Sequence, residues 1–340
     1  MKKVVSALAV LTVAAAASAA APKVEFVKGE NEVDVVADGR LVASYVYADE
    51  LPKPSLVPLR STSGIEVTRR WPLTELEGGS MDHLHHVGLF FCVDRVNGTN
   101  FWNYYRNPDG KEPKIRHVKF DRMEGGPGRA VLRTVSQWID KKGDFMLEEK
   151  RSMTFIAGEH EAEYAIDFGI DLTAQSEQVV FEDIEEGVLG VRLSDYLRES
   201  DREGGVRPGR PVPEESVAGT GSYFNSNGDQ SARDCWGKRA RWVALQGVKG
   251  GRVVGVAILN HPESINYPTY WHVRDYGLFS ANPLGQGDFQ RQSKYKGNPV
   301  VPLNLTLKPG RTAHFRFLVI VFEGIRTQRQ IEERFQAFVK

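Results

Sequence analysis

The residues best suited to chemistry stand in SMDHLHHVGLFFCVD, residues 80–94, where three histidines and an aspartate precede an apolar run. In an extended chain, His83 and His85 would share one face and His86 would point to the other. Imidazoles spaced in this way can bind a transition metal once further ligands complete the set. They can equally serve as acid–base groups, or hydrogen-bond to backbone groups where a strand begins. We predict a functional site at Asp82, His83, His85 and His86 and leave its metal content open.

A second group lies in NHPESINYPTYWHVRDYGLFSANPLG, residues 260–285, which combines large rings with polar side chains. Proteins hold sugars in this way, because rings stack on the apolar faces of a pyranose while polar side chains bond its hydroxyls. The prolines of the stretch favour an irregular loop, where binding sites are common. A buried aromatic corner of the core is the structural alternative. The candidate residues here are His261, Tyr270, Trp271, His272, Arg274 and Asn282.

A third group of candidate residues is acidic. In FEDIEEGVLGVRLSD, residues 181–195, several carboxylates crowd the start of an apolar strand that carries Arg192. Crowding and partial burial would raise the pKa of at least one of them, as a general acid or base requires. A solvated acidic turn would give the same pattern. Glu186 is our candidate for the carboxylate partner of the histidines.

Alternation with period two dominates the chain and predicts the strands that must position these residues. VDVVADGRLVASYVY, residues 33–47, indicates two strands joined by a tight turn at Asp38-Gly39. Residues 130–140 and 145–156 form a second candidate hairpin, and residues 162–174, 252–260 and 313–324 are further strands. One helix is expected at residues 327–339, where Thr327 and Gln330 form a capping box. The pattern is typical of an all-β sandwich or barrel with a C-terminal helix.

The first twenty residues have the features of a signal peptide, with Lys2 and Lys3, an apolar stretch, and small residues suited to cleavage. No later stretch is long and apolar enough for a membrane-spanning helix. We therefore expect a periplasmic or secreted protein, with no membrane insertion after cleavage of residues 1–20. Residues 21–340 are expected to form a single domain with a long polar loop near residues 199–235.

Charge and cysteine content narrow the classes of function. Lys+Arg and Asp+Glu each number 44, so the composition offers no basis for binding nucleic acid. Cys92 and Cys235 are the only cysteines, and they could pair in an oxidising compartment or stay reduced. The sequence has no GxSxG, P-loop, HExxH, CxxC or dinucleotide-binding motif. These absences argue against serine hydrolases, zincins and nicotinamide enzymes.

Four motifs in order resemble a bacterial domain family of unknown function labelled methane oxygenase-like (PmoA-like): KPSLVPLRSTSGIEVTR, DHLHHVGLFF…VNGTNFW, GKRARWV and HPESINYPTYWHVRDYGLFSANPLG. The resemblance covers nearly the whole mature chain. The usual form of one motif is Asp-His-Pro-His-His-Arg-Gly, whereas Leu84 and Val87 stand here at the Pro and Arg positions. The resemblance implies a large antiparallel supersandwich similar to galactose mutarotases, in organisms that degrade complex carbohydrate. The motif histidines correspond here to His83, His85, His86, His261 and His272.

Together these features predict an exported carbohydrate-active enzyme that uses acid–base chemistry on a sugar or keto-sugar, as a glycoside hydrolase, lyase or epimerase. The predicted catalytic residues are His83, His86, Glu186 and His272, and the predicted substrate-binding residues are His85, His261, Tyr270, Trp271, Arg274 and Asn282. No cofactor is expected, and a divalent metal is an option. Two alternatives stay open. One is a non-catalytic glycan-binding protein; the other is a metalloenzyme in which His83 and His85 bind Zn, Fe or Mn together with His272 or Glu186.

Overall fold

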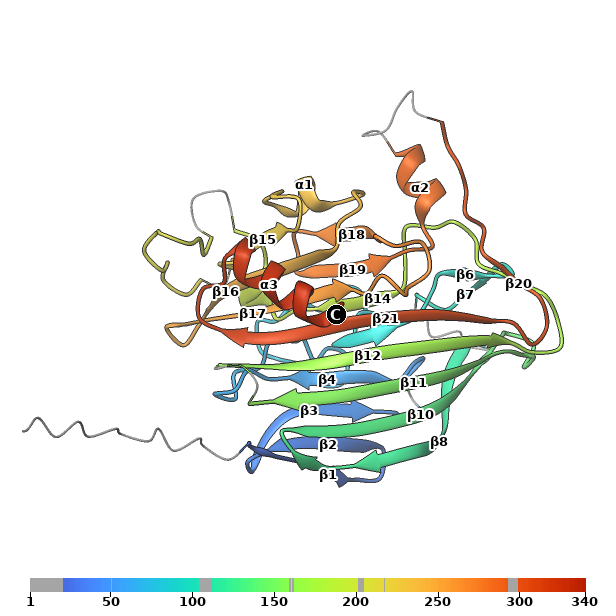
Figure 1. Ribbon diagram of the computed structural model, residues 1–340, viewed down its shortest axis with the longest axis horizontal. Coiled ribbons are helices and arrows are strands. Elements are labelled where there is room, and N and C mark those ends of the chain that lie inside the picture. The colour runs from blue at the N-terminus through green and yellow to red at the C-terminus, as the bar shows by residue number, and fades with distance from the viewer. Residues whose placement is uncertain are drawn as a thin grey trace, which may run out of the picture.

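Two large antiparallel sheets form the framework of the described chain, which comprises residues 21–49, 51–103, 112–158, 160, 162–200, 205–216, 218–292 and 299–340 of the computed structural model (Figure 1). One sheet has nine strands and the other has eight. The predicted fold class, an all-β antiparallel sandwich with a C-terminal helix, is confirmed. The predicted signal peptide, residues 1–20, lies outside the described residues.

The strands follow one another across each sheet in a defined order. The nine-stranded sheet runs β18 (Tyr270–Arg274), β19 (Leu278–Asn282), β14 (Leu189–Arg192), β5 (Leu89–Phe91), β4 (Ser55–Leu59), β3 (Arg40–Val46), β2 (Glu32–Ala37), β1 (Lys23–Lys28) and β9 (Gly126–Pro127). The eight-stranded sheet runs β15 (Ser222–Asn225), β16 (Trp242–Lys249), β17 (Arg252–Asn260), β21 (Thr312–Glu323), β12 (Glu163–Ala174), β11 (Phe145–Ala157), β10 (Arg129–Ile139) and β8 (Lys114–Glu124). Two small ribbons pair β6 (Arg95–Val96) with β7 (Thr99–Asn100) and β13 (Val179–Val180) with β20 (Thr306–Leu307). The helices are η1 (Asp195–Leu197), α1 (Ala232–Cys235), α2 (Gln286–Arg291) and α3 (Gln328–Phe338).

The hairpins predicted from local signals are present. Asp38 and Gly39 join β2 to β3 with φ angles of +48° and +75°. Positive φ at both positions suits the tight turns whose twist matches that of paired strands. The pair β10–β11 forms the second predicted hairpin.

The hydrophobic core lies between the two sheets. Phe91 of β5 contacts Phe315 of β21 and Trp138 of β10, with ring centroids 5.5 and 6.3 Å apart. Because successive strand residues point to opposite faces, Leu318 and Ile320 of β21 face away from this core and into a second cluster. Burying each such side chain stabilises the fold by about 1.5–3 kcal/mol.

Helix α3 covers that second cluster on the outer face of the eight-stranded sheet (Figure 1). It begins with the predicted capping box, in which the N–H of Gln330 donates to Thr327 Oγ1 over 3.3 Å and the N–H of Thr327 donates to Gln330 Oε1 over 2.9 Å. Ile331 and Phe335 are buried in the same cluster as Ile320. The helix therefore adds a third layer on one side of the sandwich only.

The cap at Thr327 gives a first testable prediction. Thr327→Ala should lower the free energy of unfolding by about 1 kcal/mol, because the N–H of Gln330 in the first helical turn loses its side-chain acceptor. Thr327→Ser keeps the hydroxyl and should stay close to the wild type. Denaturant unfolding measures both variants, and an equal loss in the two would show that the hydroxyl does not act as a cap.

The stretch 199–235, predicted as one long loop, contains β15 and α1 as well as irregular chain. Cys235 ends α1, and both Cys235 and Cys92 are buried free thiols, so the two do not pair. In the described part of the chain, no helix has the length and apolar character needed to cross a membrane.

Candidate active site

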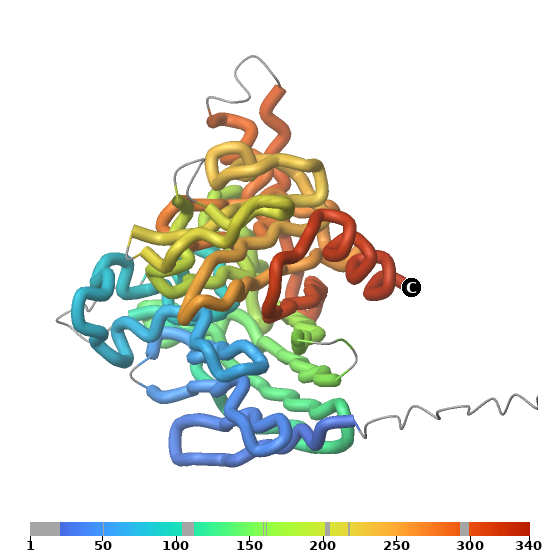
Figure 2. Tube along the Cα trace, turned by 90° about the vertical axis from the view of Figure 1, so that its left-hand side faces the viewer, coloured from blue at the N-terminus to red at the C-terminus, as the bar shows by residue number. Residues whose placement is uncertain are grey.

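Four of the candidate residues, His83, His85, His86 and His272, lie on the face of the nine-stranded sheet that points away from the core. Register places His272 of β18 opposite Ser280 of β19. The same row continues through Gly190 of β14 to Phe90 of β5. Opposite residues in a sheet share a face, and the alternate residue Trp271 belongs to the core. Figure 2 shows the segment around residues 70–100, in cyan, on the opposite side of the molecule from α3.

Residues His83 to His86 form a tight turn, in which the N–H of His86 donates to the carbonyl oxygen of His83 over 3.0 Å. His83 takes the left-handed conformation, with φ +44°. Such a conformation costs a non-glycine residue roughly 1–3 kcal/mol and is concentrated at functional sites. The prediction of an extended chain is wrong here because of this turn. The turn brings His83, His85 and His86 together, with one ring nitrogen of each within 4.8 Å of the others.

The imidazoles pack among other rings. His83 stacks on His86 with centroids 5.0 Å apart and on Tyr276 with centroids 4.9 Å apart. His86 also stacks on Phe90 and meets Trp102 edge to face at 5.5 Å. His86 is 2% exposed, and neither of its ring nitrogens has a hydrogen-bond partner among the described residues. The side chain of His83 is 39% exposed, so the cluster opens to solvent at His83.

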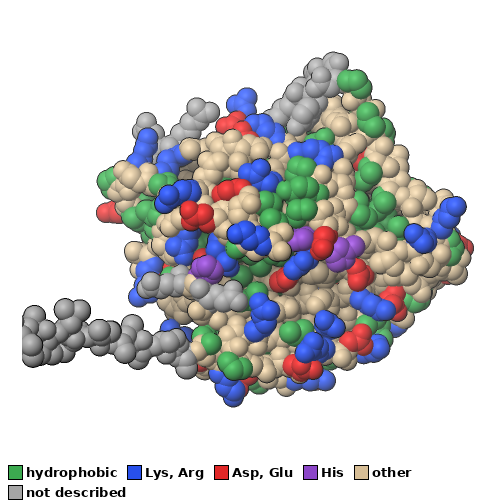
Figure 3. Space-filling model, in the orientation of Figure 1, with side chains coloured by type: hydrophobic (Ala, Val, Ile, Leu, Met, Phe, Trp, Pro, Cys, Tyr) green, Lys and Arg blue, Asp and Glu red, His purple; other side chains and the backbone are tan. Residues whose placement is uncertain are grey.

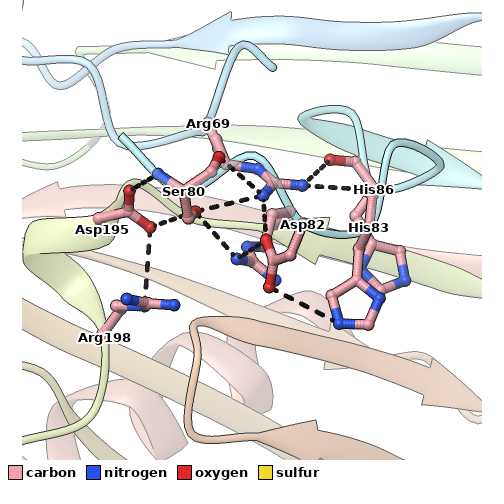
Figure 4. A network of polar contacts seen from close by, with 8 residues as sticks. Arg69, Ser80, Asp82, His83, His86, Asp195 and Arg198 are labelled. Carbon is pink, nitrogen blue, oxygen red and sulfur yellow. Dashed lines mark hydrogen bonds and ion pairs between the residues drawn. The ribbon is translucent and has the colours of Figure 1, made fainter. Parts of the chain in front are cut away.

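Two buried arginines hold Asp82 beside the turn. Arg69 Nη1 and Arg192 Nη2 both donate to Asp82 Oδ1, over 2.5 and 2.9 Å. Arg69 Nη2 donates to the carbonyl oxygens of His83 and His86, over 2.9 and 3.3 Å (Figure 4). The other carboxylate oxygen of Asp82 lies 3.6 Å from Nε2 of His83. Burial raises the pKa of Asp82, but the two arginines lower it by more than burial raises it. The pKa of Asp82 is therefore below its usual value, and the group is a carboxylate at neutral pH.

Burial keeps the three imidazoles uncharged at neutral pH. It lowers the pKa of His85 to about 3, assisted by the positive charge of Lys53. It also lowers the pKa of His86 well below its usual value, and that of His83 below its usual value. Lys53 is itself 1% exposed and donates from Nζ to the carbonyl oxygen of Trp102 over 2.9 Å. Each uncharged ring keeps a lone pair on one nitrogen.

His272 lies beside the same cluster, but both of its ring nitrogens are hydrogen-bonded. Its ring stacks near Trp102, with centroids 6.4 Å apart. Nδ1 donates to the carbonyl oxygen of Glu185 over 3.0 Å, and Nε2 accepts from Nε of Arg274 over 2.9 Å. Burial, followed by the charge of Arg274, lowers the pKa of His272 to about 3. The prediction of His272 as an acid–base group is wrong, because its nitrogens orient Arg274 and the Glu185 backbone.

Glu186 is the group best suited to proton transfer near neutral pH. Burial raises the pKa of Glu186 to about 7, and the negative charges of Glu185 and Asp94 raise it in the same direction. Asp94 is 7% exposed, and burial raises its pKa to about 6. A carboxylate oxygen of Glu186 lies within 4.8 Å of ligand atoms of Glu185 and His272. Glu186 stays our candidate acid–base residue, now with a physical cause for its pKa.

The predicted stacking rings are internal to the protein. Trp271 is fully buried on the core face of β18, and its Nε1 donates to the carbonyl oxygen of Ala240 over 2.9 Å. Tyr270 is buried against Phe289, with ring centroids 5.4 Å apart, and lies under Arg239. The prediction of a sugar-stacking wall at these two positions is wrong. Neighbouring strand residues point to opposite faces, and both rings are covered.

Asn282 and Arg274 support the acidic turn from β18 and β19. Asn282 is fully buried, and its Nδ2 donates to the carbonyl oxygens of Ile184 and Glu185 over 2.9 and 2.8 Å. Its Oδ1 accepts from the N–H of Leu284 over 3.0 Å, so the prediction that Asn282 binds substrate is wrong. Arg274 pairs with the carboxylate of Glu185 over 2.9 Å. Its side chain is 36% exposed and therefore can still reach a ligand.

His261 lies on the other side of the molecule. Its ring meets Phe338 of α3 edge to face, with centroids 4.8 Å apart, and its Nδ1 accepts from the N–H of Glu263 over 3.2 Å. Figure 3 shows this side, where histidine, basic and acidic side chains mix over the eight-stranded sheet. The prediction that His261 joins the site is wrong, because α3 and the histidine turn lie on opposite faces of the sandwich.

Sequence reasoning missed several residues around the turn: Lys53, Arg69, Trp102 and Tyr276. A buried lysine or arginine has no signature in a pattern of apolar alternation. A signal was nevertheless present, since Lys53 and Arg69 are the first and last residues of one motif quoted above, and Trp102 ends the next. The ends of these motifs therefore mark residues that lie around the histidine turn.

The family DUF6807, described as a family of unknown function, matches residues 32–336. The chain belongs to this family. The histidine turn, the buried arginines and the acidic turn of the DUF6807 chain all fall inside the matched range. The methane oxygenase-like label is not part of this match and stays a prediction.

No curated protein matches the chain. Solved structures similar to it include a galactose mutarotase related enzyme from Lactobacillus acidophilus, at 8% identity and a TM-score of 0.32, covering 89% of this chain and 98% of that one. Another, from Escherichia coli K12 and provisionally assigned as an aldose 1-epimerase, has 13% identity and a TM-score of 0.32, covering 90% of this chain and 100% of that one. TM-scores and identities this low support no conclusion about the function of the DUF6807 chain.

Proposed function

We propose that this DUF6807 protein is an exported carbohydrate-active enzyme that transfers a proton on a sugar or keto-sugar, with Glu186 as the general base. The observation that carries the proposal is the grouping of Glu186 with His272, whose ring lies near Trp102, the ring that packs on His86 of the histidine turn. The pKa of Glu186, raised to about 7, supports the role, because a base works best when its pKa lies near the working pH.

Partly exposed rings near Arg274 support a sugar as the ligand. Trp236 lies under the guanidinium of Arg274, 5.9 Å from it, and Tyr276 follows Arg274 in the turn between β18 and β19. Tyr276 also packs on Arg192, with the guanidinium 4.4 Å from the ring centroid. Rings beside a charged donor can stack on a pyranose while the donor bonds its oxygens. They replace the buried Tyr270 and Trp271 as candidate stacking groups.

The carboxylates favour epimerisation or elimination over glycoside hydrolysis. Hydrolases need two carboxyl groups that both reach the scissile bond. Here Glu185 is paired with Arg274, and Asp94 is buried, which leaves Glu186 as the carboxyl group able to act. Removing a proton next to a carbonyl requires only one such base. We therefore place keto-sugars first among the substrates.

Solvent deuterium exchange tests this proposal. The wild type is incubated in D₂O with neutral sugars, uronic acids and keto-sugars, and NMR follows deuterium entering at carbon, while absorbance follows unsaturated products. We expect exchange or elimination with at least one class. Tyr276→Ala should raise KM more than it lowers kcat, because the ring contacts ground state and transition state alike. Binding of glycans without any turnover across the panel would instead establish the non-catalytic alternative.

A further inference from the structure

We propose that His83, His85 and His86 bind one divalent transition-metal ion, of the class that prefers imidazole ligands, such as Zn²⁺. Three histidine ligands with a remaining open position are the arrangement of catalytic zinc sites. Ligand atoms of the three rings lie within 4.8 Å of one another, which small rotations would bring to a common ion. The turn closed by the hydrogen bond from His86 to His83 is what makes three nearly consecutive residues converge.

The state of His86 is an independent observation. Its ring is 2% exposed, and neither nitrogen has a hydrogen-bond partner among the described residues. A buried polar group left without a partner costs about 1–3 kcal/mol. By contrast His272, in the neighbouring cluster with Glu185 and Glu186, has both nitrogens engaged. The histidine turn therefore has free imidazole lone pairs, whereas the one imidazole of the neighbouring cluster has none.

Asp82 fits the role of a carboxylate outside the ligand set. Histidines that bind metals usually donate their second N–H to such a group, which fixes the ring. Oδ2 of Asp82 lies 3.6 Å from Nε2 of His83, which leaves Nδ1 for the ion. Arg69 and Arg192 hold the other oxygen of Asp82, and Arg69 also bonds the turn carbonyls, so carboxylate and ligands are fixed by one network (Figure 4).

The charges around the turn determine which kind of fourth ligand would bind at the open coordination position. Arg69, Arg192 and Lys53 are close to the rings, and Asp82 is the negative charge paired with the two arginines. This excess of positive charge favours an anionic fourth ligand, such as an ionised sugar oxygen or a carboxylate. A bound ion would then polarise the oxygen of the sugar that the proposed function places beside Glu186. The metal site itself stands without that function.

Metal binding is measured directly on the full mature chain. The protein is dialysed against a chelator, desalted and titrated with Zn²⁺ by calorimetry, with elemental analysis of the complex and Co²⁺ absorption as a probe of coordination. We expect one equivalent in the wild type. His83→Ala should lose binding, and since His83 is partly exposed this variant should fold even if His86→Gln does not. Asp82→Asn should weaken binding about 10–100-fold.

His261→Ala is the matched control, since it removes a histidine on the opposite face of the sandwich, and should bind as the wild type does. No Zn²⁺ or Co²⁺ bound by the wild type, or equal binding by His83→Ala, would overturn the site. Glu186→Gln should keep the metal. If the wild type binds metal but catalyses no deuterium exchange, only the proposed function is contradicted. If it catalyses exchange but binds no metal, only the metal site is contradicted.

Discussion

Glu149→Ala should lower the free energy of unfolding by about 3–5 kcal/mol, because it leaves a buried arginine without its counter-charge. Glu149 and Arg151 are 0% and 1% exposed, and Arg151 Nε donates to Glu149 Oε1 over 2.8 Å. Trp138 Nε1 donates to the second carboxylate oxygen over 2.9 Å. Alanine at position 149 would remove both partners at once and open a cavity beside them.

The matched control removes both charges. In Glu149→Leu/Arg151→Met, apolar side chains of similar volume replace the pair, and most of the lost stability should return, because no unpaired charge stays buried. Urea unfolding of the wild type, the single variant and the double variant measures the difference. If the double variant were as unstable as the single one, the destabilisation would come from lost packing and not from the orphaned guanidinium of Arg151.

This buried pair also connects the core to the candidate site. Arg151 Nη1 donates to the carbonyl oxygen of Pro54 over 3.3 Å, and Lys53 and Pro54 directly precede β4. Lys53 in turn holds the carbonyl of Trp102, whose ring packs on His86. Two hydrogen bonds, one peptide bond and one ring contact therefore link the buried pair to the histidine turn. Glu149→Ala should disturb the site only as far as it moves Pro54.

The sheets could be predicted from the sequence because their signals are local. Alternation marks strands such as β11 and β12, a continuous apolar run marks β17, and Asp38-Gly39 marks its own turn through positive φ. The cap at Thr327 is likewise complete within four residues. None of these features depends on contacts with distant parts of the chain, so the local sequence is enough to predict each of them.

The sequence predicts that the histidines form a cluster, but it does not predict the tight turn that brings them together. The residues SMDHLHHVG suggested a strand entrance, whereas Arg69 and Arg192, far apart along the chain, hold the segment as a turn. Those contacts are long-range and leave no periodic trace. The prediction for Trp271 is wrong for a different reason. The composition of residues 260–285 suits a sugar-binding platform, and only the strand register shows that Trp271 points into the core.

Glu186→Gln should lower the rate of proton transfer by about 10²–10⁴-fold, which is what a positioned general base contributes. Since the pKa of Glu186 is raised to about 7, the wild-type rate should rise with pH through about 7, as the carboxylate form replaces the acid. The amide of glutamine cannot take the proton, so the variant should lose this rising limb. Rates of deuterium exchange between pH 5 and 9 measure both effects.

A second variant separates the base from its surroundings. Burial, Glu185, Asp94 and Asp288 all raise the pKa of Glu186, so Asp94→Asn should move the rising limb to lower pH while leaving the plateau rate nearly unchanged. The control is Glu182→Gln, in the same acidic turn. Glu182 is partly exposed and accepts from the N–H of Gly98, and its variant should behave as the wild type. A rising limb that persists in Glu186→Gln would assign the titration to another group. A limb that Asp94→Asn fails to move would remove the like charge of Asp94 as a cause of the raised pKa of Glu186.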